Sequence, residues 1–297
     1  TRAENFTTII SIAPSPVDEK VIWVGTDDGN LQLTKDGGKN WTNLASRLTG
    51  LPKGSWMAQI EVSKKNAGEA FVVANDYRRN NWKPYVYHTN DYGSTWRRIA
   101  DENKVEGYAI SIVQDPVEPK LLFLGTDYGL FVTIDGGTTW NKWMHNYPSV
   151  STSDLKIHPR EHDLIIGTFG RAAYILDDIR PLRELAQSSG RVFKKDFHVF
   201  EAPDAYMVSY RSVDGVRFGA NAHYKGQNKS SNAMISFWAN VKKTEKKDET
   251  TDKSKAKKKG KKKSKASTDT TAKPADKTEK KGKKKDDKKA NLPPKKK

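Results

Sequence analysis

Short runs of apolar residues recur in a regular order along the first 182 residues. Residues 8–13 alternate apolar and polar positions, as expected for a strand with one buried face. Residues 21–24 form a continuous apolar run, which is typical of a strand covered on both faces, and shorter runs follow at 31–33 and 41–44. Turn-forming residues separate these runs, so the pattern predicts four short strands in succession.

The same order returns three more times. The expected strands are 58–62, 70–73, 85–87 and 96–99 in the second unit, 110–112, 121–124, 130–132 and the segment from 140 in the third, and 154–157, 164–166 and 173–176 in the fourth. Units of about 40–50 residues with four strands each are typical of β-propeller blades. We therefore predict an all-β fold in which residues 1–182 form four blades, each a four-stranded antiparallel sheet. We expect these to be the last blades of a larger ring, in a chain that is a piece of a longer protein.

An eight-residue motif, Thr-x-Asp-x-Gly-x-(Thr/Asn)-Trp, connects the third and fourth strands of the first three units. Its acids and indoles are Asp36, Trp41, Asp91, Trp96, Asp135 and Trp140. We expect each Asp to accept backbone N–H bonds within its own turn, and each Trp to fill the gap between packed sheets. Asn40 stands where the other copies have Thr, and we expect it to weaken one turn hydrogen bond. The three acids are thus predicted to be structural and not catalytic.

The pattern changes after residue 182. Residues 182–186 predict one or two helical turns, and strand-like runs at 206–210, 216–220 and 233–239 predict a partial β-sandwich-like module over 183–241. Residues 242–297 hold 25 of the 53 Lys and Arg residues and none of the 29 aromatic residues. Such a segment buries too little apolar surface to fold, so we predict a disordered Lys-rich linker or tail.

The formal charge of +17 is confined almost entirely to this tail, because residues 1–241 carry 28 basic and 27 acidic side chains. The tail lacks aromatic residues for base stacking and mixes Lys with acids, so we expect no nucleic-acid partner. A solvated linker is the favoured interpretation, and weak electrostatic contact with anionic surfaces is the alternative. No apolar run approaches the roughly 20 residues of a membrane span. No signal peptide is present in this sequence.

Candidate binding residues lie in the loops that follow the second strand of each unit. They are Tyr77, Arg78, Arg79, Trp82, Asp127, Tyr128, Phe169 and Arg171. Aromatic and Arg side chains together suit carbohydrate stacking or peptide recognition, whereas the alternative is that they pack the ends of the blades. The same loops hold Asp27, Asp28, Asp76 and Asp127, which are either glycosidase-type acids or ordinary turn formers.

No cofactor or metal site is predicted. Cysteine is absent, which excludes disulfides and thiolate ligands. His158 and His162 are four residues apart, but Pro159 and the neighbouring strands place them on a loop and not on a metal-binding helix. No Gly-rich phosphate loop and no Ser-His-Asp set is evident, so no catalytic residue is assigned.

The motif resembles the Asp-box or BNR repeat of sialidases, two-propeller xyloglucanases, photosystem II assembly factors and the sortilin (VPS10) propeller. The fourth unit, with residues 157–159, 167–171 and 174–182, resembles the last blade of large secreted sortilin-like proteins of Bacteroidetes-type bacteria, often labelled glycosyl hydrolases. The Arg-Ile-Pro motif of sialidases is absent, and so is the cysteine-rich module of animal sortilin.

This resemblance implies an exported protein, secreted or in the cell envelope. We expect a propeller that acts as a binding or assembly module and presents its loop face to a protein partner or a polysaccharide. The alternative is a glycoside hydrolase of the sialidase or xyloglucanase type, whose catalytic carboxylates lie largely outside this sequence.

Overall fold

Fifteen short strands form four antiparallel sheets in the computed structural model, which describes residues 7–205 and 232–241. The first blade contains β1 (Ile9–Pro14), β2 (Ile22–Thr26), β3 (Leu31–Thr34) and β4 (Thr42–Asn43). The second contains β5 (Trp56–Val62), β6 (Ala70–Asp76), β7 (Asn81–Thr89) and β8 (Arg97–Ala100). The third contains β9 (Ala109–Gln114), β10 (Leu122–Thr126), β11 (Gly129–Thr133) and β12 (Asn141–Lys142). The fourth contains β13 (Thr152–Ile157), β14 (Leu164–Thr168) and β15 (Ala173–Leu176).

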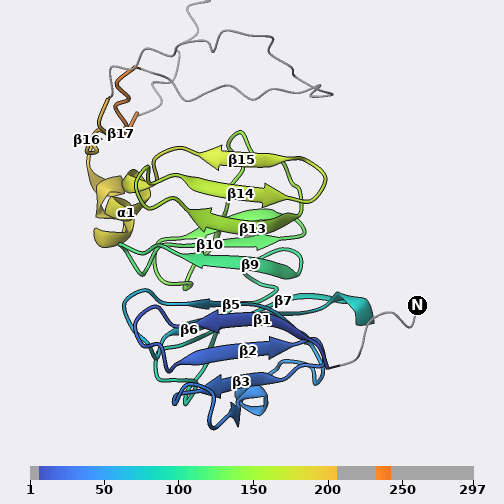
Figure 1. The fold of residues 1–297 in the computed structure, drawn as a ribbon. Coiled ribbons are helices and arrows are strands. Elements are labelled where there is room, and N and C mark those ends of the chain that lie inside the picture. Colours follow the sequence, from blue (N-terminus) through green and yellow to red (C-terminus); the bar gives the residue numbers. More distant parts are fainter. Residues whose placement is uncertain (1–6, 206–231, 242–297) are drawn as a thin grey trace, which may run out of the picture. The chain divides into compact units, whose positions relative to one another are not determined.

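Each sheet is an antiparallel meander in which the strands lie in chain order (Figure 1). The predicted all-β fold with propeller blades is therefore confirmed. The second strands β6 and β10 are buried along their whole length, as their continuous apolar runs predict. The fourth blade has three strands within the described residues and lacks the eight-residue motif, as its sequence indicates.

Successive blades are joined along their first strands. Hydrogen bonds from one first strand to the next connect Ile60 N to Ser11 Oγ at 3.0 Å, Ile112 N to Gln59 Oε1 at 2.6 Å, and Ser111 Oγ to Thr152 O at 3.3 Å. Three apolar clusters fill the spaces between the sheets, centred on Trp23 and Met57, on Ile99 and Leu122, and on Phe123 and Leu155. Burial of these side chains is what holds each blade against its neighbour.

The three motif acids bind their own turns, as predicted. Each Oδ1 accepts the backbone N–H four residues later at 2.9 Å, in Asp36, Asp91 and Asp135. The hydrogen bonds from Asn40, and in the second copy from Thr95, lower the pKa of Asp36 and Asp91 to about 2. The carboxylates therefore stay ionised as structural acceptors at neutral pH.

The expectation that Asn40 weakens its turn is wrong. Asn40 Nδ2 donates to Asp36 Oδ2 at 2.7 Å, in the place of the Thr95 hydroxyl, which donates to Asp91 Oδ2 at 2.7 Å. An amide N–H reaches the same oxygen as a hydroxyl does, so the number of turn hydrogen bonds is unchanged.

Two of the three motif indoles pack against the preceding blade, and all three lie just before the fourth strand of their unit and not within it. Trp96 meets Trp23 edge to face with ring centroids 6.0 Å apart, and Trp140 donates its indole N–H to Ile99 O at 2.9 Å. Trp41 has no such neighbour among the described residues and is 44% exposed. Two of the three indoles thus fill gaps between sheets as predicted.

Opposite ends of each blade carry the motif and the predicted binding loops. Because the strands alternate in direction, the third-to-fourth connection lies at the end opposite to the second-to-third connection. Backbone bonds confirm this, since the motif turn pairs with the first-to-second connection, as in Gly37 N to Lys20 O at 3.0 Å and Gly136 N to Lys120 O at 2.9 Å. We call the end with the second-to-third connections the loop face.

A short helix follows the fourth blade. It is α1 (Arg180–Gln187), which confirms the helical turns expected at 182–186, and strands β16 (Phe197–Val199) and β17 (Phe237–Ala239) then pair antiparallel. The expected strands at 206–210 and 216–220 lie outside the described residues, and so does the tail from 242. The boundary predicted between residues 182 and 183 falls within α1 and stays a prediction.

Helix α1 is tied to the third blade by a buried ion pair. Arg183 Nε donates to Asp115 Oδ2 at 2.8 Å, and the two side chains are only 7% and 0% exposed. Arg183 Nη1 also donates to His162 Nδ1 at 3.0 Å.

Candidate functional site

The connection between β6 and β7 carries three of the predicted site residues, and a fourth, Trp82, is the second residue of β7. Tyr77, Arg78 and Arg79 form a 3₁₀ turn, and Asn80 ends it in the left-handed conformation at φ 60°. Asp76 stabilises this turn, because its buried carboxylate accepts the Arg79 Nε–H at 2.5 Å and an amide N–H of Asn81 at 3.1 Å. The loop is thus preorganised by its own hydrogen bonds.

Aromatic rings gather around this turn on the loop face. Tyr77 stacks on Tyr108 with ring centroids 4.7 Å apart, and Trp82 lies 5.7 Å from Tyr108 and 6.2 Å from Tyr77. The Arg78 guanidinium lies 3.1 Å from the ring centroid of Trp56. Residues from β5, from the β6–β7 connection and the start of β7, and from the β8–β9 connection therefore form one cluster, which we call the aromatic cluster.

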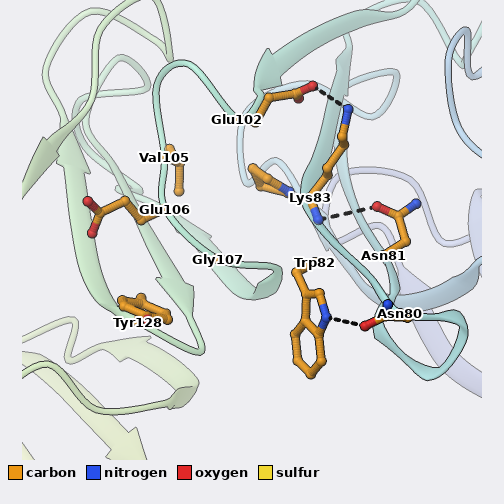
Figure 2. Close-up of a pocket in the computed structure, with 10 residues that line it drawn as sticks. Asn80, Asn81, Trp82, Lys83, Glu102, Val105, Glu106, Gly107 and Tyr128 are labelled. Carbon is orange, nitrogen blue, oxygen red and sulfur yellow. Dashed lines mark hydrogen bonds and ion pairs between the residues drawn. The ribbon is translucent and has the colours of Figure 1, made fainter.

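A shallow groove of about 600 Å³ adjoins this cluster between the second and third blades. Figure 2 shows Trp82 on one side of the groove and Tyr128 on the other, with Gly107 between them. Trp82 is 52% exposed and Tyr128 is 55% exposed. Both large aromatic rings therefore present accessible surface at the groove, where side chains of this kind usually mark a binding site.

The charged side chains along the groove are paired. Lys83 Nζ lies 2.8 Å from Glu102 Oε1, and Lys142 Nζ lies 2.9 Å from Glu106 Oε2. The hydrogen bond from Lys83 lowers the pKa of Glu102 to about 2. Neutralised pairs leave the groove without a strong net charge.

Asp127 differs from the other loop acids. Its Oδ1 is buried and has no hydrogen-bond partner among the described residues, and a Cβ at Gly107 would lie 1.9 Å from it. Burial raises the pKa of this carboxyl above its ordinary value. Asp127 thus lies beneath the groove wall that Gly107 and Tyr128 form.

The remaining loop acids accept hydrogen bonds. Asp28 accepts an amide N–H of Asn30 at 2.9 Å, and Asp76 likewise binds within its own turn, so these two fit the turn-forming interpretation. Asp27 Oδ1 instead accepts the Thr8 N–H at 2.8 Å, from a residue 19 positions earlier in the chain.

Phe169 and Arg171 make no ring contact or ion pair with the aromatic cluster among the described residues. Both are exposed on the β14–β15 connection of the fourth blade, with Phe169 80% exposed. The structure thus brings together Tyr77, Arg78 and Trp82, places Tyr128 across the groove, and keeps Arg79 in the loop itself.

Sequence reasoning missed Trp56 and Tyr108. Trp56 begins β5, and Tyr108 directly precedes β9, so each ends a connection that enters a blade on the loop face. The signal was present in the strand pattern, since the residue before a first strand lies at the same end as the second-to-third loops.

Among the described residues, no group of three or more His, Asp or Glu side chains is arranged to hold a metal ion. Within the same part of the chain, no helix is long and apolar enough to span a membrane.

A family model described as Sortilin, neurotensin receptor 3 matches residues 84–286, which is more than half of the chain. The chain belongs to the Sortilin-Vps10 family. The matched segment begins in β7, so it includes the third and fourth blades and the groove residues Glu106 and Tyr128.

Curated proteins similar to this Sortilin-Vps10 chain include two fungal ones. An "oligoxyloglucan-reducing end-specific xyloglucanase" of Emericella nidulans is 25% identical over 167 residues, which is 50% of this chain and 19% of that protein. A "probable oligoxyloglucan-reducing end-specific xyloglucanase" of Neosartorya fischeri is 26% identical over 159 residues, 49% of this chain and 18% of that protein. The chain therefore spans about a fifth of the length of these relatives.

Solved structures similar to this family member include the GH74 xyloglucanase from Xanthomonas campestris, at a TM-score of 0.47 and 17% identity, covering 58% of this chain and 29% of that one. YCF48 bound to D1 peptide has a TM-score of 0.43 and 20% identity, covering 58% and 52%.

Proposed function

We propose that this chain is a binding module that presents its loop face to a partner, a polysaccharide or a protein. The observation that carries the proposal is the pair of half-exposed rings, Trp82 and Tyr128, on opposite sides of one groove. Large aromatic side chains contribute much of the binding free energy at interfaces, because they bury large apolar areas with little loss of conformational entropy.

Hydrogen bonds and a ring contact support the two rings. Trp82 Nε1 donates to Asn80 Oδ1 at 2.9 Å, and Lys142 Nζ lies 5.4 Å from the centroid of the Tyr128 ring. Asp76 holds the turn that precedes Trp82. A preorganised site loses less conformational freedom on binding, and that favours a recognition role for this face.

The test is a glycan array beside a pull-down from the envelope of the source cells. Trp82→Ala and Tyr128→Ala are each expected to weaken capture of the partner about tenfold or more, since truncation removes an anchor ring. Trp41→Ala is the matched control, because Trp41 is a half-exposed indole at the motif end of a blade. Equal binding by all three variants and the wild type, with unchanged thermal stability, would place the binding site elsewhere.

A second candidate function is glycoside hydrolysis of the xyloglucanase type. One observation favours it: the fungal relatives are named as xyloglucanases. The arrays distinguish the two functions, because a hydrolase releases new reducing ends from a bound xyloglucan oligosaccharide and a binding module does not.

The proposed setting is outside the cytoplasm of a bacterium, either secreted or in the cell envelope. The fungal xyloglucanases match this chain, and polysaccharides of that kind are met outside cells. Fractionation of the source cells checks this, and recovery of the chain from the cytoplasm alone would contradict it.

A further inference from the structure

Arg78 lies against the ring of Trp56 on the loop face, with Tyr77 nearby. Its guanidinium carbon lies 3.1 Å from the ring centroid of Trp56 and 5.5 Å from that of Tyr77. Stacking fixes the plane of a guanidinium and leaves the N–H groups along its edges available for hydrogen bonds. Arg78 is exposed, so these edges are accessible from solvent.

Two neighbouring basic side chains, Arg79 and Lys83, have acidic partners, whereas Arg78 has none among the described residues. Arg79 pairs with Asp76 at 2.5 Å and Lys83 pairs with Glu102 at 2.8 Å. Across the described part of the chain, no hydrogen bond or ion pair engages the Arg78 side chain. A fixed guanidinium with unused donors matches the fork geometry of a carboxylate.

The aromatic cluster links Arg78 to the groove. Tyr77 contacts Arg78 on one side and stacks on Tyr108 on the other, and Tyr108 lies 5.7 Å from Trp82. Trp82 then lines the groove opposite Tyr128 (Figure 2). A continuous series of ring contacts therefore joins the free cation of Arg78 to Trp82, which lines the groove with Tyr128.

We propose that this surface binds an acidic polysaccharide, with the carboxylate of a uronic acid residue on Arg78 and sugar rings stacked on Trp82 and Tyr128. This proposal rests on the proposed binding function and names its ligand class. The C–H faces of pyranose rings fit flat aromatic surfaces at an open groove, and the side-chain NH2 of Asn80, whose oxygen accepts the Trp82 indole N–H, suits a sugar hydroxyl. An acidic peptide without ring-bearing side chains, such as polyglutamate, would satisfy Arg78 but has no flat groups to match the two ring faces.

The experiment measures binding of the full chain to polygalacturonate, to its fully methyl-esterified form and to polyglutamate, at 0.3 M salt. High salt screens the contribution of the Lys-rich tail, which is the same in every variant. Wild type is expected to bind polygalacturonate about tenfold more tightly than the ester, because a charge-assisted bidentate pair is lost with the charge. Arg78→Gln should remove this difference, and Arg160→Gln, a matched exposed Arg paired with Glu161, should keep it.

The other outcomes separate the two proposals. If Arg78→Gln still prefers the acid, or if wild type binds the acid and the ester equally, the role of Arg78 is refuted. If wild type binds polygalacturonate and its methyl ester equally, and Trp82→Ala abolishes binding of both, the proposed binding function stands. Polyglutamate binding that equals polygalacturonate binding and depends on Arg78 would replace the polysaccharide with an acidic peptide. If none of the three polymers binds, the acidic-polysaccharide ligand is refuted, while the pull-down decides the binding function separately.

Discussion

At the scale of single residues, the groove depends on one close contact. Gly107 has φ of 78°, a backbone conformation that residues other than Gly rarely adopt, and a Cβ there would collide with Asp127 Oδ1. The glycine therefore allows the β8–β9 connection to cover the Asp127 carboxyl and to form the wall next to Tyr128.

Gly107→Ala is expected to lower the free energy of unfolding by more than the roughly 1–2 kcal/mol of left-handed backbone strain. Gly37→Ala is its control, since Gly37 has φ of 74° and nothing within 4 Å of an added Cβ. Chemical denaturation of both variants measures the difference. Equal losses in the two variants would show that the contact with Asp127 has no energetic weight.

At the scale of elements, much of the fold follows from the sequence. Strand periodicity locates β1 to β15 to within a few residues, because each strand has its own buried pattern and its own turn residues. The motif turns are equally local, since Asp91 reaches a backbone N–H only four residues away. The strands and the motif turns can be predicted from the sequence because the interactions that form them join residues close together in the chain.

The candidate site was predicted less completely, because some of its contacts join residues that are far apart in the sequence. Tyr77, Arg78 and Trp82 lie within one short segment, so their proximity is evident from the sequence. Trp56 in β5 and Tyr108 before β9 lie 22 and 30 positions from Arg78 along the chain. The strand pattern indicates the end of the blade on which they lie, but not that they contact this cluster.

The contact between α1 and His162 predicts that the stability of the protein depends on pH. Burial, and then the nearby Arg183 charge, lower the pKa of His162, whose Nδ1 accepts a hydrogen bond from Arg183. Below about pH 6.5 the unfolded chain binds a proton at this His before the folded chain does, so the free energy of unfolding falls as the pH falls. This stabilising contribution is fully present above that pH.

Denaturation curves between pH 8 and pH 5 measure this loss. His162→Asn is the control, because Asn tolerates the left-handed φ of 59° at this position and does not titrate in this range. The account expects the variant to show a smaller loss of stability on acidification than the wild type. An identical pH profile in both proteins would exclude His162 as the source.

At the scale of the whole described molecule, the two ends of the blades have separate roles. Motif turns at one end hold carboxylates in local hydrogen bonds, and the loop face carries the exposed rings, the groove and the unpaired Arg78. Under the proposed function, the loop face binds the partner and the motif turns maintain the architecture.

The central claim is that the groove beside Trp82 is the binding surface. Hydrogen–deuterium exchange of the full chain, with and without the partner captured in the pull-down, tests it most directly. The account predicts slower exchange on binding in residues 77–83, 105–108 and 128, and unchanged exchange in the motif turns at 34–41, 89–96 and 133–140. Protection confined to the motif turns, or to neither set, would contradict it.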